Sequence, residues 1–315
     1  MAEIIRPAVP RPIRIRRNAH TVDPDVLTFY GRAIGEMKLA RLSGNASEIA
    51  SPLSWRYQAA MHEYTRARDP NAQASDLPLP SDSGTFWTQC EHFNWFFLPW
   101  HRMYLHFFEM ILLSHVVRLG GPTDWALPYW NYSNPGQSTL PAAFRTPATA
   151  ANHLFITQRD TDANGGGTAF VAPRPPGALP PFDLTRAMGE TVFENVPGVS
   201  GFGGARVTGA GGSLESVPHG SMHNRIAGPT GFMRDFVKVG LDPIFWLHHC
   251  NIDRLWKAWL RQGGGRANPA DGGWLSRSFP FHDATGQRAD MTVSQVIDTR
   301  AEPLSYIYDD GDEPV

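Results

Sequence analysis

Residues 242–256 read DPIFWLHHCNIDRLW, and this order of residues predicts a long helix. Asp242 is a good N-cap because its carboxylate can accept hydrogen bonds from first-turn amides, and Pro243 suits the first helical position, where a missing N–H costs little. The glycines that begin at Gly263 should end the helix. His248 and His249 follow in the second turn, so at least one of them can point into the protein interior.

Residues 92–109 read HFNWFFLPWHRMYLHFFE and predict a second long helix. Pro99 is tolerated in its first turn, and the apolar pattern continues to about Leu119, just before a pair of glycines. His92 therefore lies just ahead of the helix, and His101 lies just inside it.

The remaining sequence predicts a mainly α fold, a helical bundle core with long irregular loops and few short strands. Two further helices are expected, at residues 24–42 and 54–68, and the latter contains His62. The other expectations are an extended arm at 1–18, a long loop region at 135–218, an irregular tail from 269, and a late strand at 304–308. Sequence features near both ends of the chain are expected to belong to one hydrophobic core. This favours a single domain that comprises residues 1–315.

The histidines cluster rather than scatter. His219 and His223 lie at i and i+4, so on a helix both rings project from one face and can share a metal ion. Isolated histidines such as His20, His153 and His282 are interpreted as ordinary packed or surface residues. Histidine clusters on several helices, among tryptophans and phenylalanines, instead favour a metal centre.

The ligand types indicate which metal is bound. Neither the regular Cys/His spacing of zinc fingers nor the Glu-x-x-His pairs of di-iron bundles are present. A histidine-only set in an aromatic pocket favours copper, which binds imidazole strongly among divalent ions. A structural zinc site in a binding module remains an alternative hypothesis.

Composition excludes several classes of function. Hydrophobic residues make up 42% of the 315 residues and charged residues 18%, which is against global disorder. A net charge of -2 gives no case for nucleic acid or an anionic membrane surface as a partner. The first twenty residues lack the apolar segment of a secretory signal, so a cytoplasmic location is expected, with export by a partner left open. Cys90 and Cys250 are too few for a disulfide framework.

The two quoted stretches resemble the copper-binding signatures of the tyrosinase, catechol oxidase (polyphenol oxidase) and molluscan haemocyanin family of type-3 dicopper proteins. The resemblance implies one tyrosinase-like catalytic domain, and two copper ions that bind dioxygen between them as a bridging peroxide. Relatives often carry a C-terminal lid domain, and none is expected here because the sequence ends seven residues after Tyr308. Matched by position, the ligands of the first copper are His62, His92 and His101. Those of the second are His219, His223 and His249.

The resemblance also implies roles for residues near the ligands. Cys90 occupies the position of a cysteine that forms a thioether with a ligand histidine, here His92. Glu215 matches a glutamate that holds an active-site water and is the candidate base, and Phe236 matches a phenylalanine placed over the first copper. His248 becomes a neighbour of the ligand His249.

Three further positions complete the expected site. Gly220 stands where many bacterial tyrosinases carry asparagine, and Asn224 follows His223 instead. Asp253 shares a helix face with His249 and is expected to orient a ligand imidazole. Near the chain's end, Tyr306 and Tyr308 resemble the family's Tyr-x-Tyr motif and are expected to pack against Arg16 or Arg17.

The implied function is oxidation of ortho-diphenols to ortho-quinones by dioxygen, with phenolic small molecules as substrates. Gly220 favours diphenol oxidation as the dependable activity, and hydroxylation of monophenols stays open. The alternatives are an ortho-aminophenol oxidase and a haemocyanin-like dioxygen carrier. A partner protein that delivers copper is also left open, because some relatives need one.

Overall fold

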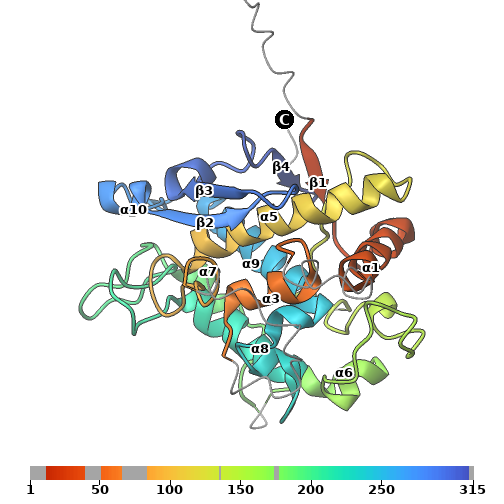
Figure 1. Cartoon of the computed structure of the whole chain (residues 1–315). Helices are drawn as coiled ribbons and strands as arrows, with labels where there is room; N and C mark the ends of the chain where they lie inside the picture. The colour runs from red at the N-terminus through yellow and green to blue at the C-terminus, as the bar shows by residue number, and fades with distance from the viewer. Residues whose placement is uncertain (1–11, 40–50, 66–83, 135, 174–176, 312–315) are drawn as a thin grey trace, which may run out of the picture.

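The computed structural model describes residues 12–39, 51–65, 84–134, 136–173 and 177–311, and two long helices form its centre. Helix α5 (Phe97–Arg118) packs against α9 (Pro243–Arg261), and Figure 1 shows α5 running across the middle of the molecule. The Asp242 side chain accepts a hydrogen bond from the Ile244 amide, as expected of an N-cap. Both long helices are confirmed. None of the helices in the described ranges is long and apolar enough to cross a bilayer.

Aromatic side chains fill the contact between the two central helices. Phe108 of α5 stacks on Trp246 of α9, with ring centroids 3.4 Å apart and an interplanar angle of 10°. Tyr104 also contacts Trp246, at 4.7 Å between centroids. Buried aromatic rings contribute large apolar areas and restrict the relative position of their helices. The two helices therefore form a firm frame for the residues that they carry.

Two of the predicted helices have their expected starts. Helix α1 (Pro24–Leu39) packs on α5, and the rest of its predicted range lies outside the described residues. Helix α3 (Trp55–His62) begins after the N-cap Ser54 but ends earlier than predicted, because Glu63 is extended. The carbonyls of residues 60–62 accept hydrogen bonds from the amides of residues 88–90. These contacts satisfy the backbone groups at the helix end, and residues 66–68 lie outside the described ranges.

Within residues 136–173 and 177–218, the chain is largely irregular, as predicted, and its helices are short. These are η3 (Ala142–Phe144), α6 (Thr161–Gly165), η4 (Ala169–Val171), α7 (Thr185–Gly189) and, at its end, the π-helical turn η5 (Glu215–Gly220). Helix α8 (Ser221–Ala227) follows η5 directly, and two turns lie between α8 and α9, η6 (Phe232–Arg234) and η7 (Val239–Leu241).

The prediction of an irregular tail from residue 269 was wrong. The tail contains α10 (Gly272–Ser276), an antiparallel hairpin of β2 (Ser278–His282) and β3 (Arg288–Thr292), and the turn η8 (Val293–Val296). Pro280 lies inside β2 and argues against a strand, but a two-stranded sheet has only edge strands, where proline is tolerated. The hairpin lies beside α5, which β2 contacts (Figure 1).

Strand β1 (Arg14–Arg16) and strand β4 (Tyr306–Tyr308) join the two ends of the described chain. They pair in parallel, with Arg14 opposite Tyr306 and Arg16 opposite Tyr308. The Arg16 guanidinium lies 3.7 Å from the centre of the Tyr306 ring and donates to the Tyr308 hydroxyl at 3.1 Å. The predicted late strand and the predicted contact of both tyrosines with Arg16 are confirmed.

A buried network of charges fixes these strands to the two central helices. Arg16 donates to Glu109 of α5 at 2.8 Å, and Arg102 of α5 donates to Asp253 of α9 at 2.5 Å. Asp253 also accepts from the hydroxyls of Tyr306 and Tyr308, at 2.5 and 2.6 Å. Burial alone would raise the pKa of Asp253, but the arginines beside it hold that pKa below its usual range. Asp253 is therefore a buried, ionised carboxylate that connects α5, α9, β1 and β4.

Replacing Asp253 with asparagine should lower the free energy of unfolding by about 3–5 kcal/mol, because the buried Arg102 would lose its counter-charge and Arg16 would keep only Glu109. The matched control is Asp290→Asn, which breaks an exposed pair with Arg288 and should cost less than about 1 kcal/mol. Urea denaturation measures both values. Equal losses in the two variants would contradict a structural role for the network.

Candidate metal centre

Three of the predicted ligand histidines form a first set. His62 is the last residue of α3, His92 lies in the loop before α5, and His101 lies in the first turns of α5. Their ligand nitrogens lie within 4.8 Å of one another, and all three side chains are buried. The chain thus brings together residues almost forty positions apart into one possible metal site.

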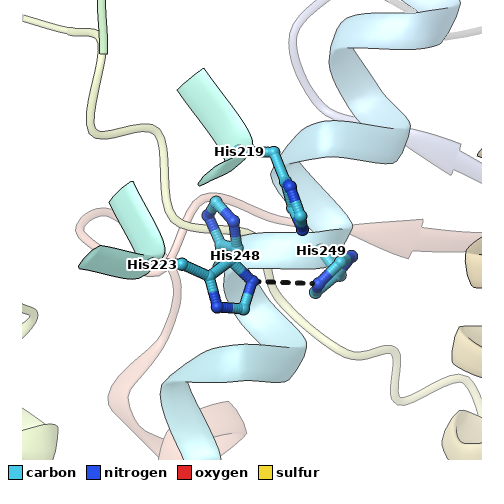
Figure 2. Close-up of side chains that lie close together, drawn as sticks. All are labelled: His219, His223, His248 and His249. Atoms are coloured by element: carbon cyan, nitrogen blue, oxygen red, sulfur yellow. Dashed lines mark hydrogen bonds between the residues drawn. The ribbon is translucent and has the colours of Figure 1, made fainter. Parts of the chain in front are cut away.

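A second set lies around the start of α8 and the middle of α9. His219 and His223 project from η5 and α8, and His248 and His249 come from α9, with ligand nitrogens within 4.8 Å of one another. Figure 2 shows the rings of these four residues converging, with His223 Nε2 3.4 Å from His249 Nε2. The expected convergence of the i and i+4 pair is confirmed, with ring centroids 4.5 Å apart.

The two histidine sets lie directly beside each other. His101 of the first set stacks on His249 of the second, with centroids 4.4 Å apart and an interplanar angle of 7°. His92 and His219 also approach, at 5.8 Å between centroids. This proximity is what a pair of metal ions sharing a small ligand would require.

Backbone carbonyls fix the orientation of four of these rings. The Nδ1 atoms of His62, His101, His219 and His223 lie 2.8–3.0 Å from the carbonyl oxygens of Phe236, Phe97, Glu215 and Met233, respectively. A carbonyl can only accept, so each hydrogen bond places the ring proton on Nδ1 and leaves the lone pair on Nε2. The Nε2 atoms of His62, His101 and His219 are buried without a hydrogen-bond partner among the described residues.

Burial also keeps these imidazoles neutral. It lowers the pKa of His62 to about 3 and that of His223 to about 4, and it lowers the pKa values of His92, His101, His219 and His249 well below the usual range. Neutral rings with free Nε2 lone pairs are the form that binds metal. By donor chemistry and by their unpartnered buried nitrogens, the two sets fit two copper ions.

His248 and His249 differ in their surroundings. His249 contacts His101 of the first set, whereas His248 lies against Tyr132, at 5.6 Å between ring centroids, and stacks on His219. Both nitrogens of His248 are buried and without partners among the described residues. The position of His249 between the two sets favours it as the ligand, and that assignment stays a prediction.

Cys90 lies beside the ring that the predicted thioether would join. Its Sγ atom is 3.2 Å from Nδ1 of His92, and its backbone amide donates to the carbonyl of His62 at 3.2 Å. The cysteine is thus held next to the first set, while Cys250 is buried in α9, as expected of a small core residue. Formation of the thioether stays a prediction.

A cavity of about 270 Å³ opens onto both sets, with four of the predicted ligands in its wall. Phe236 also lines the cavity and contacts both His62 and His92, with centroids 5.9 and 5.0 Å away. This placement over the first set agrees with the position expected for Phe236. An aromatic ring at the wall can stack against a planar substrate.

Glu215 supplies a buried carboxyl group to the same cavity. Its Oε1 atom accepts from the Phe93 amide at 2.8 Å, and its Oε2 atom is buried without a partner among the described residues. Burial raises the pKa of Glu215 to about 8, so the group can exchange a proton near neutral pH. Glu215 therefore lies in the cavity beside the histidine sets, and its role as the base stays a prediction.

Gly220 and Asn224 also line the cavity. A Cβ atom at Gly220 would meet its nearest neighbour, the Glu215 carbonyl, at an ordinary 3.4 Å, so a side chain fits there. The Asn224 amide donates to the Gly220 carbonyl at 3.0 Å. This hydrogen bond uses one of the two N–H groups of the Asn224 amide.

One predicted role was wrong. Asp253 was expected to orient a ligand imidazole, but its oxygens accept from Arg102, Arg16 and two tyrosines. Nδ1 of His249 is buried and has no hydrogen-bond partner among the described residues. Helical spacing correctly placed the Asp253 carboxylate on the same face of α9 as His249. The carboxylate pairs with the arginines instead of the neutral imidazole, because hydrogen bonds between charged groups are stronger.

Sequence reasoning missed the contributions of the backbone. The carbonyls of Phe97 and Glu215 precede their histidines by four residues, so helix geometry could have indicated them. The carbonyls of Met233 and Phe236 belong to an irregular segment, and no side-chain pattern points to them. Arg234, which also lines the cavity, was missed because it carries no metal-ligand signature.

Comparison with known families gives matches over most of the chain. The sequence model of the common central domain of tyrosinase matches residues 52–262, and that of the polyphenol oxidase middle domain matches residues 268–314. Tyrosinase HcTyr1 of Hahella sp. (strain CCB-MM4) is 38% identical over 94% of this chain and 63% of its own length. The chloroplastic polyphenol oxidase of Malus domestica is 31% identical, over 97% and 50%. The chain thus spans half to just under two thirds of these relatives.

Solved structures give the same result. Latent apple tyrosinase superposes with a TM-score of 0.72 at 27% identity, covering 96% of this chain and 64% of that chain. The polyphenol oxidase of Grenache (Vitis vinifera) superposes with a TM-score of 0.69 at 26% identity, covering 98% of this chain and 89% of that chain. The helical fold is therefore that of these oxidases.

The metal-free protein should lose stability as the pH falls below about 6.5. Burial lowers the histidine pKa values in the folded state, so the unfolded chain takes up protons first. His62 and His223 can each contribute a slope of up to about 1.4 kcal/mol per pH unit between pH 6.5 and pH 4. Urea denaturation of chelator-treated protein at several pH values measures this slope.

The variant His223→Gln should show a shallower decline, because one titrating ring is gone. A wild-type unfolding free energy that is constant from pH 6.5 to pH 5 would contradict neutral, buried histidines.

Proposed function

The chain belongs to the tyrosinase family, and from this we propose that it is a dicopper oxidase that uses dioxygen to convert ortho-diphenols into ortho-quinones. The observation that carries the proposal is the convergence of two histidine sets beside one cavity, with unpartnered buried Nε2 atoms in both sets, on His62, His101 and His219. The family matches and the histidine-only donor set support copper as the metal.

We assign His62, His92 and His101 to one copper ion and His219, His223 and His249 to the other. When bound, the copper pair supplies the electron transfer from phenol to dioxygen that amino-acid side chains cannot perform. The carbonyl contacts keep four of the rings in the tautomer that can bind the metal. The frame of α5 and α9 keeps His101 of one set stacked on His249 of the other.

Residues of the cavity wall position the substrate and move its protons. The Phe236 ring offers a face against which a catechol ring can stack. Oxidation of a catechol to a quinone releases two electrons and two protons, which end in water together with oxygen from O2. Glu215 Oε2, buried and unpartnered among the described residues, is the candidate acceptor of a phenolic proton, directly or through a water.

We further propose that diphenol oxidation exceeds monophenol hydroxylation. Hydroxylation needs a phenol that has lost its proton before it reaches the metals, so it depends on a well-held base and water. Gly220 has no side chain to hold such a water, and the Asn224 amide already gives one of its two N–H groups to the Gly220 carbonyl. The missing side chain at Gly220 is the observation that supports weak activation of monophenols.

The proposal is tested by oxygen uptake of copper-loaded protein with a catechol, a monophenol and an ortho-aminophenol in parallel. The catechol should be oxidised fastest. His249→Ala should lower the copper content from two ions per chain toward one and abolish uptake, while His248→Gln should keep both ions. Faster turnover of the aminophenol would favour an aminophenol oxidase, and oxygen binding without turnover would favour a dioxygen carrier.

Loading with copper salt alone also tests for a delivery protein, since a need for one would appear as incomplete copper content. A single bound zinc ion, with no copper pair after loading, would overturn the proposal.

Replacing Glu215 with glutamine should lower kcat for the monophenol by about 100-fold or more, because general-base catalysis typically contributes that much. KM should change little, since the amide keeps the size of the carboxyl group. Copper content serves as the control and should stay at two ions per chain. An unchanged kcat with full copper content would remove Glu215 from the mechanism.

A further inference from the structure

Residues 233–236 form a short segment attached to both histidine sets. The Met233 carbonyl accepts from His223 of the second set at 2.8 Å, and the Phe236 carbonyl accepts from His62 of the first set at 3.0 Å. Met233 is buried in the turn η6, and both residues line the cavity. The position of this segment relative to the metal centre is therefore fixed at both of its ends.

Arg234 lies between these two attached residues and differs from them in exposure. It is solvent-exposed, yet it lines the cavity. Its backbone is held, because its amide donates to the Gly231 carbonyl at 3.2 Å. Among the described residues its guanidinium has no ion-pair or hydrogen-bond partner, whereas the neighbouring Asp235 pairs with Lys238 at 3.3 Å.

Arg234 is also the one permanent cation among the described residues that line the cavity. Apart from the histidines and Glu215, the other lining residues are apolar or polar without charge, and they include Phe93, Ser216 and Val239. Glu215 is buried and bonded to the Phe93 amide, so it is not a partner for the exposed guanidinium. An unpaired guanidinium at a cavity entrance favours an anion, and its planar donors match a carboxylate.

We propose that Arg234 selects phenolic substrates that carry a carboxylate on the ring substituent opposite the reacting hydroxyls. The carboxylate would bind the guanidinium at the entrance while the ring lies against Phe236 and the hydroxyls reach the histidine sets. This inference rests on the proposed oxidation of phenols and names the substrate class of that same site. It concerns a residue that binds substrate and takes no part in the redox step.

The kinetic test compares 3-(3,4-dihydroxyphenyl)propionate with its uncharged amide. Arg234→Gln should raise KM for the acid by about five- to tenfold, the size expected for loss of a partly exposed charged hydrogen bond, while kcat stays the same. Values for the amide should stay within about twofold of wild type, since a neutral group gains little from the cation. Arg234→Lys should restore part of the preference, and Arg234→Glu should reverse it.

Two controls separate recognition from general effects. Lys238→Gln removes a positive charge from a neighbouring residue that does not line the cavity, and it should leave the acid-to-amide ratio unchanged. The preference of wild type for the acid should fall as salt is added, because salt screens an exposed ion pair. Equal ratios in wild type and Arg234→Gln, or an equal loss in Lys238→Gln, would overturn the inference.

A binding measurement makes the inference independent of turnover. Calorimetry with 3-phenylpropionate and 3-phenylpropanamide, which have no hydroxyls to oxidise, should show tighter binding of the acid by wild type only. If wild type oxidises no catechol, the proposed function fails, and this comparison still tests Arg234. If catechols are oxidised but acid and amide bind alike, only the role of Arg234 is wrong.

Discussion

Six imidazoles can converge on one small volume only if none of them carries a charge. Burial supplies that condition here, because it lowers the pKa of every predicted ligand histidine below its usual range. Backbone carbonyls then decide which nitrogen of four rings keeps its proton. The metal-binding property is thus built into the protein interior before any metal arrives.

The same interior holds full charges only one helical turn away. Arg102 follows His101 directly in α5, and Asp253 lies one turn beyond His249 in α9, so the Arg102–Asp253 pair closes the two helices next to the stacked rings of His101 and His249. Arg16 and the two tyrosines of β4 complete the network. The charged residues thus hold α5 and α9 together, and the neutral histidines form the metal centre. Because the two groups are separate, the ion-paired residues stay charged and the ligand histidines stay neutral.

The sequence predicted those parts that depend on local signals. Apolar spacing was enough for α5 and α9, together with Pro99 in α5 and the N-cap Asp242 in α9. Histidine spacing was enough to pair His219 with His223. Tertiary contacts decided the rest: hydrogen bonds from residues 88–90 ended α3 at His62, and the exposed edge of a two-stranded sheet tolerated Pro280. The partners of Asp253 could not be predicted from spacing. Helical periodicity predicts which side of α9 a residue lies on, but it does not predict which residues of other elements pack against that side. The backbone carbonyls that accept hydrogen bonds from the histidine rings could not be predicted either, because every residue type has a backbone carbonyl.

The attachment of residues 233–236 at both ends limits how this cavity can evolve. A residue inserted between Met233 and Phe236 would move one carbonyl away from its histidine, so changes in loop length here would be selected against. Exchange of the side chains at the two middle positions would leave both carbonyls in place. Diversification of this wall should therefore proceed by point substitution, and descendants of such a protein would keep the spacing while the residues in between drift.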